Sequence, residues 1–187
     1  KFLECVADKP ISYYAFEMLY WTGIREGELL ALTPADFNFE KKTLRINKSY
    51  QRLEGKDVIT DPKTPKSNRT IVMPDFLAVE MEDFISSLYG IKDDDRIFTI
   101  SKSYLHHEMD RGAKLAGVKR IRIHGLRHSH ISLLIDLGFS ALAICERVGH
   151  EAVDITYHYA HLFPTVQTDM AAQLETEREA LVNVRKE

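Results

Sequence analysis

Alternation of apolar and polar residues is confined to one stretch of this 187-residue chain, between residues 35 and 74. There, "ADFNFEKKTLRINKSY" alternates on both sides of the turn-like "EKK", and "NRTIVMP" alternates again after a long polar connection. Three such runs predict a small three-stranded antiparallel sheet. Because apolar residues recur at helical spacing in most of the remaining chain, the pattern predicts an α+β fold that is mainly α-helical.

Helices are expected before and after that sheet in the sequence. The stretch "ISYYAFEMLYWTGI" follows Pro10 and stops at Gly23, and "REGELLAL" predicts a short helix that ends before Pro34. Residues 51–68 combine turn formers with basic residues and predict a hairpin-like excursion between the second and third strands. After Pro74 the expected helices cover roughly 75–88, 101–116, 125–137, 140–147, 152–160 and 165–183.

Length and composition predict one soluble domain. A hydrophobic content of 44% in 187 residues suits a single full-sized core. No run of 18 apolar residues could span a membrane, and "KFLECVADKP" lacks the regions of a secretory signal, so a cytoplasmic protein is expected. Cys5 and Cys145 have no metal-ligand spacing and are interpreted as reduced thiols. Because the chain begins without Met and inside a helical pattern, an upstream domain is expected to precede it.

The charge is unevenly distributed along the chain. The formal net charge is -3, which argues against a simple nucleic-acid binder. Residues 41–70, however, carry nine Lys and Arg against three acids, and residues 111–128 carry six and no acid. One basic segment alone is equally well explained as a solvated surface. Two such segments favour an anionic partner.

The stretch "HGLRHSHISLLIDLG" places His124 and Arg127 three residues apart at the start of a predicted helix, so both can project from one face. Alternatively, His124 caps the helix and Arg127 forms a surface ion pair. His124, His128 and His130 together also suggest a metal site. No acidic or cysteine ligand stands near them at a familiar spacing, which disfavours that interpretation.

Two tyrosines, Tyr157 and Tyr159, stand one residue apart in "VGHEAVDITYHYAHLF". A tyrosine hydroxyl has a pKa near 10 and is a poor nucleophile unless its surroundings activate it, so this cluster either packs in a core or performs covalent chemistry. Helical spacing puts Tyr157 on the face of Val153 and Tyr159 toward Ile155. Both faces are apolar, and spacing alone does not choose between the two tyrosines.

In chain order, these pieces resemble the catalytic domain of the tyrosine recombinases, the phage and transposon integrase family. The matching motifs are "TGIREGEL", "PKTPKSNRTIVMP", "HGLR" and "VGH", with a tyrosine nine residues after the last histidine. The resemblance covers nearly the whole chain and selects Tyr159 as the nucleophile. Its departures are Val148 in place of the usual leucine, and Lys66, which is a near neighbour of the matched lysine. The site residues that it implies are Arg25, Lys63, His124, Arg127, His150 and Tyr159.

The resemblance implies a site-specific recombinase that cuts and rejoins DNA through a covalent 3'-phosphotyrosyl intermediate, without metal or other cofactor. Arginines hold phosphate oxygens through charge-assisted hydrogen bonds, which suits Arg25 and Arg127, with His150 adding a further bond. His124 is expected to accept or orient the tyrosine proton, because imidazole titrates near neutral pH. Lys63 is expected to protonate the departing 5' oxygen.

The resemblance also implies partners. Double-stranded DNA is expected to lie against the two basic segments, held mainly through its phosphates. The helix expected at 165–183 either folds back on its own domain or docks on a neighbouring protomer. The second arrangement gives a homotetramer on synapsed DNA through C-terminal helix exchange, and the isolated chain can be a monomer. Residues 1–187 then form one catalytic domain, without the N-terminal DNA-binding domains of the family.

Two other functions compete with this one. A type IB topoisomerase uses the same tyrosine chemistry as a monomer that relaxes supercoils, but the small domain and the "TGIREGEL" context favour an integrase. A DNA-binding module that has lost catalysis is the second alternative. The presence of all six expected site residues argues against it.

Overall fold

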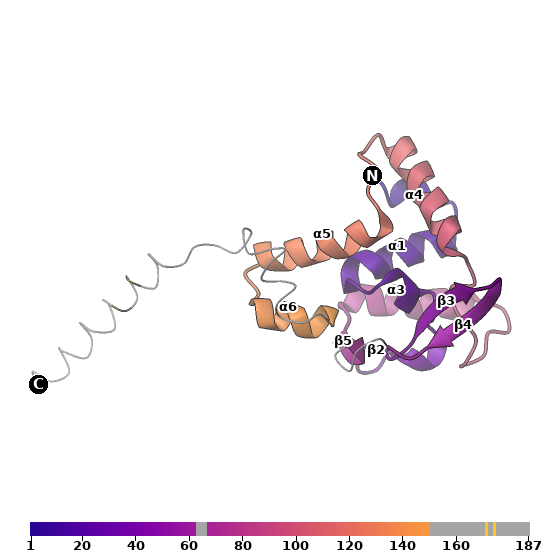
Figure 1. Ribbon diagram of the computed structural model, residues 1–187, viewed down its shortest axis with the longest axis horizontal. Coiled ribbons are helices and arrows are strands. Elements are labelled where there is room, and N and C mark those ends of the chain that lie inside the picture. The colour runs from indigo at the N-terminus through magenta and orange to yellow at the C-terminus, as the bar shows by residue number, and fades with distance from the viewer. Residues whose placement is uncertain (63–66, 150–170, 172–173, 175–187) are drawn as a thin grey trace, which may run out of the picture.

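The computed structural model describes residues 1–62, 67–149, 171 and 174 of the chain (Figure 1). The main helices are α1 (Pro10–Thr22), α3 (Asp75–Ser87), α4 (Lys102–Ala116), α5 (Ile123–Asp136) and α6 (Ala141–Val148), with a single turn, α2, at Glu26–Leu29. Short 3-10 helices, η1 and η2, occupy Glu4–Val6 and Pro34–Asp36. The helices expected at 152–160 and 165–183 fall outside the described residues, apart from positions 171 and 174.

The predicted three-stranded antiparallel sheet is confirmed. Strands β1 (Phe37–Asn38), β2 (Thr43–Ile46) and β5 (Arg69–Val72) lie in the order β1-β2-β5, and Leu44 stands opposite Ile71. Both of these side chains are buried, whereas the strand neighbours Arg45 and Thr70 are exposed. The two-residue alternation therefore marks a sheet with one face in the core.

The second expected strand is divided in the structure. β2 ends at Ile46, and a separate pair of strands follows, β3 (Ser49–Leu53) and β4 (Lys56–Thr60), joined as an antiparallel hairpin. Glu54 and Gly55 form its turn with φ of 50° and 78°, the left-handed conformation that two-residue hairpin turns require. Figure 1 shows this hairpin extending from the body, so the first part of the excursion predicted at 51–68 is a regular β-hairpin that begins at residue 49 and ends at residue 60.

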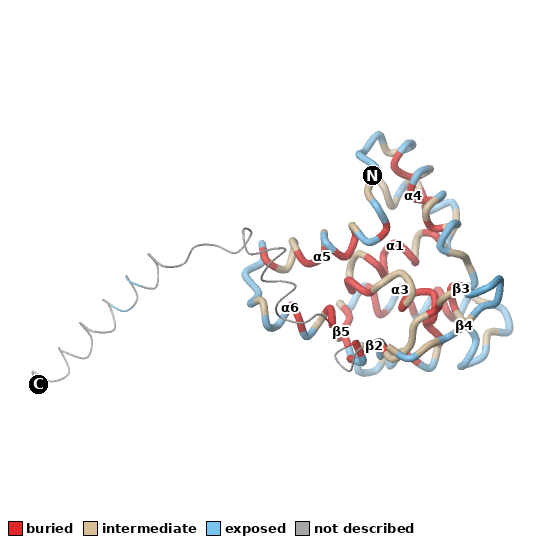
Figure 2. The backbone as a smooth tube through the Cα atoms, viewed as in Figure 1, coloured by how far each residue is buried: buried red, intermediate tan, exposed pale blue. Residues whose placement is uncertain are grey.

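Within the described part of the chain, two hydrophobic clusters hold the fold together. The larger one joins α1, the sheet, α3, α4 and the start of α5, and includes the buried side chains of Phe16, Leu44 and Met81. A smaller cluster lies between the second half of α5 and α6, around Ile131 and Ile144. In Figure 2 the buried positions accordingly concentrate in the body, with a second group where α5 and α6 face each other. Helix α5 thus connects the two clusters.

Both cysteines are free thiols, as the sequence predicts. Cys145 is buried in the smaller cluster, and Cys5 is partly buried. Among the described residues, none of the helices combines the length and the apolar content that crossing a bilayer requires.

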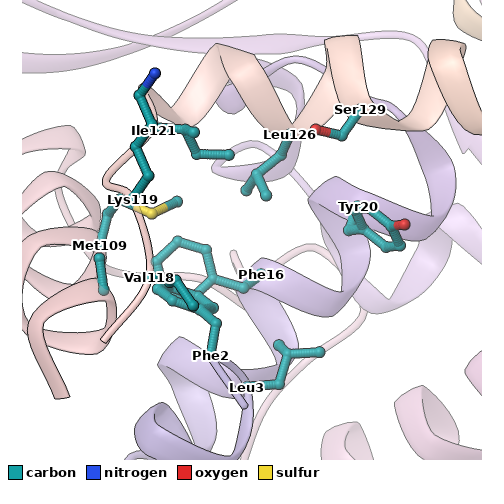
Figure 3. Close-up of a pocket in the computed structure, with 11 residues that line it drawn as sticks. Phe2, Leu3, Phe16, Tyr20, Met109, Val118, Lys119, Ile121, Leu126 and Ser129 are labelled. Atoms are coloured by element: carbon teal, nitrogen blue, oxygen red, sulfur yellow. The ribbon is translucent and has the colours of Figure 1, made fainter. Parts of the chain in front are cut away.

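An apolar pocket of about 260 Å³ lies where the N-terminal residues, α1, α4 and α5 meet. Figure 3 shows the rings of Phe2 and Phe16 together at its centre, with Ile121 and Leu126 above them. These two rings pack edge to face with centroids 5.0 Å apart. Of the site residues that the structure describes, neither Arg25 nor His124 nor Arg127 lines this pocket.

Gly23 ends α1 in a left-handed conformation, with φ of 65° and ψ of 19°. A Cβ atom at this position would lie 2.5 Å from Cδ2 of His130 and 3.3 Å from Cγ1 of Val148. Gly117 ends α4 in almost the same conformation, with φ of 64° and ψ of 30°, but faces open space. Comparing substitutions at the two glycines therefore separates the cost of the left-handed backbone conformation from the cost of crowding against neighbouring side chains.

Gly117→Ala should lower the free energy of unfolding by about 1 to 2 kcal/mol, the usual cost of the left-handed conformation. Gly23→Ala should lose that amount and a further ~1 to 3 kcal/mol, because His130 must shift. Urea unfolding of both variants gives the comparison. Equal losses at the two positions would show that the packing of Gly23 against His130 contributes nothing.

Candidate active site

Arg25 lies at the start of α2, directly after the turn that Gly23 makes. Its backbone N–H donates to Oε2 of Glu28 at 2.8 Å, and its Nη1 donates to Oε1 of the same carboxylate at 2.9 Å. Nη2 donates to the Gly149 carbonyl at 3.2 Å. The Arg25 side chain is still 37% exposed. Arg25 is therefore held in place while more than a third of its side chain stays exposed.

Glu28 is a buried carboxylate between two arginines. Arg69 donates to it through Nη1 at 3.1 Å and Nη2 at 2.9 Å, opposite the bonds from Arg25. Burial alone raises the pKa of Glu28, but the hydrogen bonds and charge of Arg69, together with the bond from the Arg25 backbone, outweigh burial and lower this pKa below its usual value. The carboxylate therefore stays ionised and keeps both guanidinium groups oriented.

Arg127 is buried, with an exposed fraction of 1%. Its Nη1 donates to the Gly23 carbonyl, and its Nη2 donates to the Val148 carbonyl at 2.6 Å. A surface ion pair, which the sequence left open for this residue, is therefore wrong. Arg127 joins the end of α1 to the end of α6.

Three arginines converge on the end of α6. The carbonyls of residues 147, 148 and 149 accept hydrogen bonds from Arg69, Arg127 and Arg25, in that order. The last carbonyls of a helix lack partners within the helix and carry partial negative charge, so cations are favoured there. This convergence brings Arg25 and Arg127, which are distant in sequence, to adjacent residues of one backbone segment.

His124 lies in the first turn of α5, with its ring exposed and edge-on to the ring of His128, at 4.7 Å between centroids. It does not cap the helix, because the N-cap position belongs to Arg122, which makes no side-chain cap bond. Partial loss of hydrating water lowers the pKa of His124, and the charges of His128, Arg127 and Arg25 lower it further. The imidazole is therefore neutral near pH 7 and able to accept a proton.

A pocket of about 220 Å³, lined mostly by residues with polar or charged groups, opens beside Arg25 and the β3–β4 hairpin. Lys48 lines it and is paired with the buried carboxylate of Asp36 at 2.5 Å. Pro62 and Ser67, the described residues on either side of segment 63–66, also line it. Arg25 therefore lines the same pocket as the two described residues that flank the segment containing Lys63.

The structure describes half of the six residues that the sequence selects. Arg25 and Arg127 meet at the end of α6, and the charges of both lower the pKa of His124. Lys63, His150 and Tyr159 lie outside the described residues. Within residues 1–62 and 67–149, no group of three or more His, Cys, Asp or Glu side chains could hold a metal ion.

The sequence interpretation missed two arginines beside the site. Arg69 was noted only as part of a motif, although its strand alternation places it on the inward face with buried Ile71. Arg147 donates from Nε to Nε2 of His130 at 3.1 Å, and to the carbonyls of Val72 and Trp21. An arginine at an inward strand position is the signal that could have revealed Arg69. Nothing in the local pattern distinguishes Arg147 from a surface residue in the last turn of a helix.

His130 provides a pH-dependent test of this packing. Burial lowers its pKa to about 4, and the charge of Arg147 acts in the same direction. In the unfolded chain its pKa is about 6.5, so the unfolded state binds the proton first as the pH falls. The stability that neutral His130 contributes is therefore present above pH 6.5 and is lost as the pH falls toward 4.

The free energy of unfolding should accordingly drop by about 2 kcal/mol between pH 7 and pH 5 through His130 alone. His130→Gln, which keeps an acceptor for Arg147 but does not titrate, should show a correspondingly smaller drop. Urea unfolding of both proteins at the two pH values measures the difference. The same drop in both would mean that His130 does not carry this pH dependence.

Comparison with known proteins agrees with the geometry. The sequence profile of the phage integrase family matches residues 2–165. The ICEBs1 integrase of Bacillus subtilis is 30% identical, over 94% of this chain and 52% of its own length. A XerC-like tyrosine recombinase of Caldanaerobacter subterraneus is 27% identical, over 85% of this chain and 48% of its own length. The chain thus spans about half the length of these relatives.

Among solved structures, the Tn1549 transposon integrase in complex with circular intermediate DNA shares this fold. Its TM-score is 0.75, with 23% sequence identity, and the match covers 95% of this chain and 63% of that one. The fold, the motif order and the family profile therefore agree. Since the profile covers most of the 187 residues, the chain belongs to the phage integrase family.

Proposed function

We propose that this chain is the catalytic domain of a site-specific recombinase that integrates or excises a mobile element. The observation that carries the proposal is the meeting of Arg25 and Arg127 at the carbonyls of residues 148 and 149, immediately before His150 in the sequence. Two guanidinium groups thus meet at the last described residues before His150, and this supports a phosphate site there. The relatives named integrase and tyrosine recombinase support the same assignment.

In the proposed reaction, the Tyr159 hydroxyl oxygen attacks the scissile phosphorus. A bond forms between this oxygen and phosphorus, and the bond from phosphorus to the 5' oxygen breaks. The tyrosine proton passes to neutral His124, and the 5' oxygen takes a proton from Lys63. Rejoining is the reverse reaction with a 5' hydroxyl of a new strand, so the energy of the phosphodiester bond is kept and neither metal nor water is consumed.

Charge develops on the two nonbridging oxygens in the transition state. Arg25 presents accessible N–H groups to an anion at this site, while Arg127 supplies a buried positive charge behind it. Oriented donors of this kind are usually the largest contribution to catalysis. Glu28 keeps Arg25 in one orientation, so little reorganisation is needed when the phosphate binds.

The basic segments and the C-terminal region define the proposed partners. Double-stranded DNA lies against the two basic segments, 41–70 and 111–128, and is bound mainly through its phosphates by their exposed Lys and Arg side chains, not by buried Arg69. Segment 165–183 repeats apolar residues at helical intervals, and Leu174 is 71% exposed. We place this segment on a neighbouring protomer, which gives a homotetramer on synapsed DNA. Because the substrate is DNA, the protein acts in the cytoplasm.

A nicked duplex tests the function directly. The duplex carries the junction DNA that flanks the gene encoding this protein, with a nick a few nucleotides downstream of the scissile phosphate. After cleavage, the short piece between the scissile phosphate and the nick, which bears the new 5' hydroxyl, diffuses away. The protein should then remain covalently attached to the 3' end of the cut strand and migrate as a protein–DNA adduct on a denaturing gel. If no adduct forms and the duplex stays uncut, or if its nick is sealed without a trapped adduct, the result would contradict this function.

A further inference from the structure

Arg69 stands at the first position of β5 and is buried, with an exposed fraction of 9%. Its guanidinium makes four hydrogen bonds. Nη1 and Nη2 donate to the two oxygens of Glu28 at 3.1 and 2.9 Å, Nη1 also donates to the Ser67 carbonyl at 3.0 Å, and Nε donates to the Arg147 carbonyl at 2.9 Å. A single planar group therefore binds two distant chain segments, α2 and the end of α6, as well as the residue just before its own strand.

The bonds to Glu28 and to the Arg147 carbonyl each connect Arg69 to a part of the candidate site. Through Glu28, Arg69 is linked to Arg25, because the same carboxylate accepts from the Arg25 backbone and side chain. Through the Arg147 carbonyl it is linked to the end of α6, whose next two carbonyls accept from Arg127 and Arg25. Arg69 itself is too buried to meet a DNA phosphate directly.

Only an arginine can make this set of bonds. A guanidinium presents its N–H groups in one rigid plane, which matches the two oxygens of Glu28 and leaves Nε for a third acceptor. A lysine ammonium keeps the charge but is a single point with no fixed plane. Replacing Arg69 by lysine should therefore keep the charge balance around Glu28 while losing the fixed orientation.

We propose that Arg69 is a positioning residue of the recombination reaction: it orients Glu28, and thereby Arg25, and holds this group against the end of α6. The inference rests on the proposed function. It assigns to Arg69 no contact with DNA, so its loss should slow cleavage of bound DNA without weakening DNA binding.

Glu108 provides a matched control. This carboxylate is also buried, with an exposed fraction of 4%, and it is also paired with an arginine, Arg111, at 2.7 Å, and with Lys9 at 2.6 Å. It lies on α4 and joins that helix to the N-terminal residues rather than to Arg25 or α6. Glu108→Gln therefore disturbs a buried pair of the same kind without reaching the candidate site.

The test measures adduct formation on the nicked junction duplex in single turnover with saturating protein, together with the Kd for the intact duplex and the thermal midpoint. Arg69→Lys should form the adduct about 100-fold more slowly, the typical effect of a misplaced catalytic group. Its Kd should stay within about threefold of the wild-type value, because no phosphate contact is lost. Glu108→Gln should keep the wild-type rate even where its thermal midpoint falls as far.

A double-mutant cycle with Arg25→Lys separates positioning from general loosening of the fold. If Arg69 acts through Arg25, Arg69→Lys should cost less than about threefold once Arg25 has already been replaced, since coupled residues are not additive. If Arg69→Lys does not fold, Glu28→Gln replaces it in the same cycle, because it removes the carboxylate that links the two arginines.

A full 100-fold loss in both backgrounds, a matching loss in Glu108→Gln, or a wild-type rate in Arg69→Lys would each overturn the inference. Absence of any adduct with the wild-type protein is a different result. It would remove the proposed function, and the inference with it.

Discussion

Tyr159→Phe should abolish the covalent adduct with a nicked duplex, whereas Tyr157→Phe should retain it. Phenylalanine fills the same space but lacks the hydroxyl oxygen that bonds to phosphorus, so the cleavage rate should fall on the order of 10⁴-fold or more. Denaturing gel electrophoresis after incubation with the labelled nicked duplex measures the adduct. The two variants differ from the wild type by the same single oxygen atom, and each serves as the control for the other.

The expectation rests on the interval of nine residues from His150 to Tyr159, a segment that follows the end of α6. Gly149 ends that helix in a left-handed conformation, and its carbonyl accepts from Arg25, so the chain leaves the helix beside the arginine pair. The reverse pattern, with the adduct lost in Tyr157→Phe and kept in Tyr159→Phe, would move the nucleophile by two residues. The other five assignments would not change in that case.

Lys63→Ala should be nearly inactive on ordinary DNA and largely active on a strand with sulfur at the 5' bridging position. A general acid contributes about 10²- to 10⁴-fold by protonating the leaving oxygen. A thiol has a pKa of about 8.5 and leaves readily as the thiolate, so it does not need that proton. Cleavage rates on the two strands, measured by the same gel assay, should therefore differ far more for this variant than for the wild type.

The controls distinguish a lost acid from a lost phosphate contact. Arg25→Ala should remain at least about 100-fold slow on both strands, because it stabilises oxygens that the sulfur does not replace. Arg127→Ala should behave likewise, but it also leaves the carbonyls of Gly23 and Val148 without their donor, so its stability must be measured alongside. Selective rescue of Lys66→Ala instead of Lys63→Ala would show that Lys66 is the acid.

Local pattern predicted most of the secondary structure. Side chains alternate in strands and recur every third or fourth residue in helices, so the three-stranded sheet and helices α1, α3, α4, α5 and α6 could be recognised from the sequence. The break between β2 and β3 was not predicted, although the three consecutive polar residues Asn47, Lys48 and Ser49 interrupt the alternation there. That break depends on packing: the hairpin backbone lies against Gly27, where a Cβ would be 2.6 Å from Oγ of Ser49 and 3.0 Å from the Tyr50 carbonyl.

The sequence by itself determined the family of this chain and the identities of the six candidate residues, because motif order and spacing are properties of the chain alone. Only the tertiary structure decided how Arg25 and Arg127 are held. Arg127 is buried against two carbonyls. Glu28 accepts from Arg25 and also from Arg69, which is 41 residues further along the chain. Hydrogen bonds between distant segments leave no periodic signal in sequence, since their partners are chosen by where the helices and strands pack. For that reason the role of Arg69 emerges only once α2, β5 and α6 are seen together.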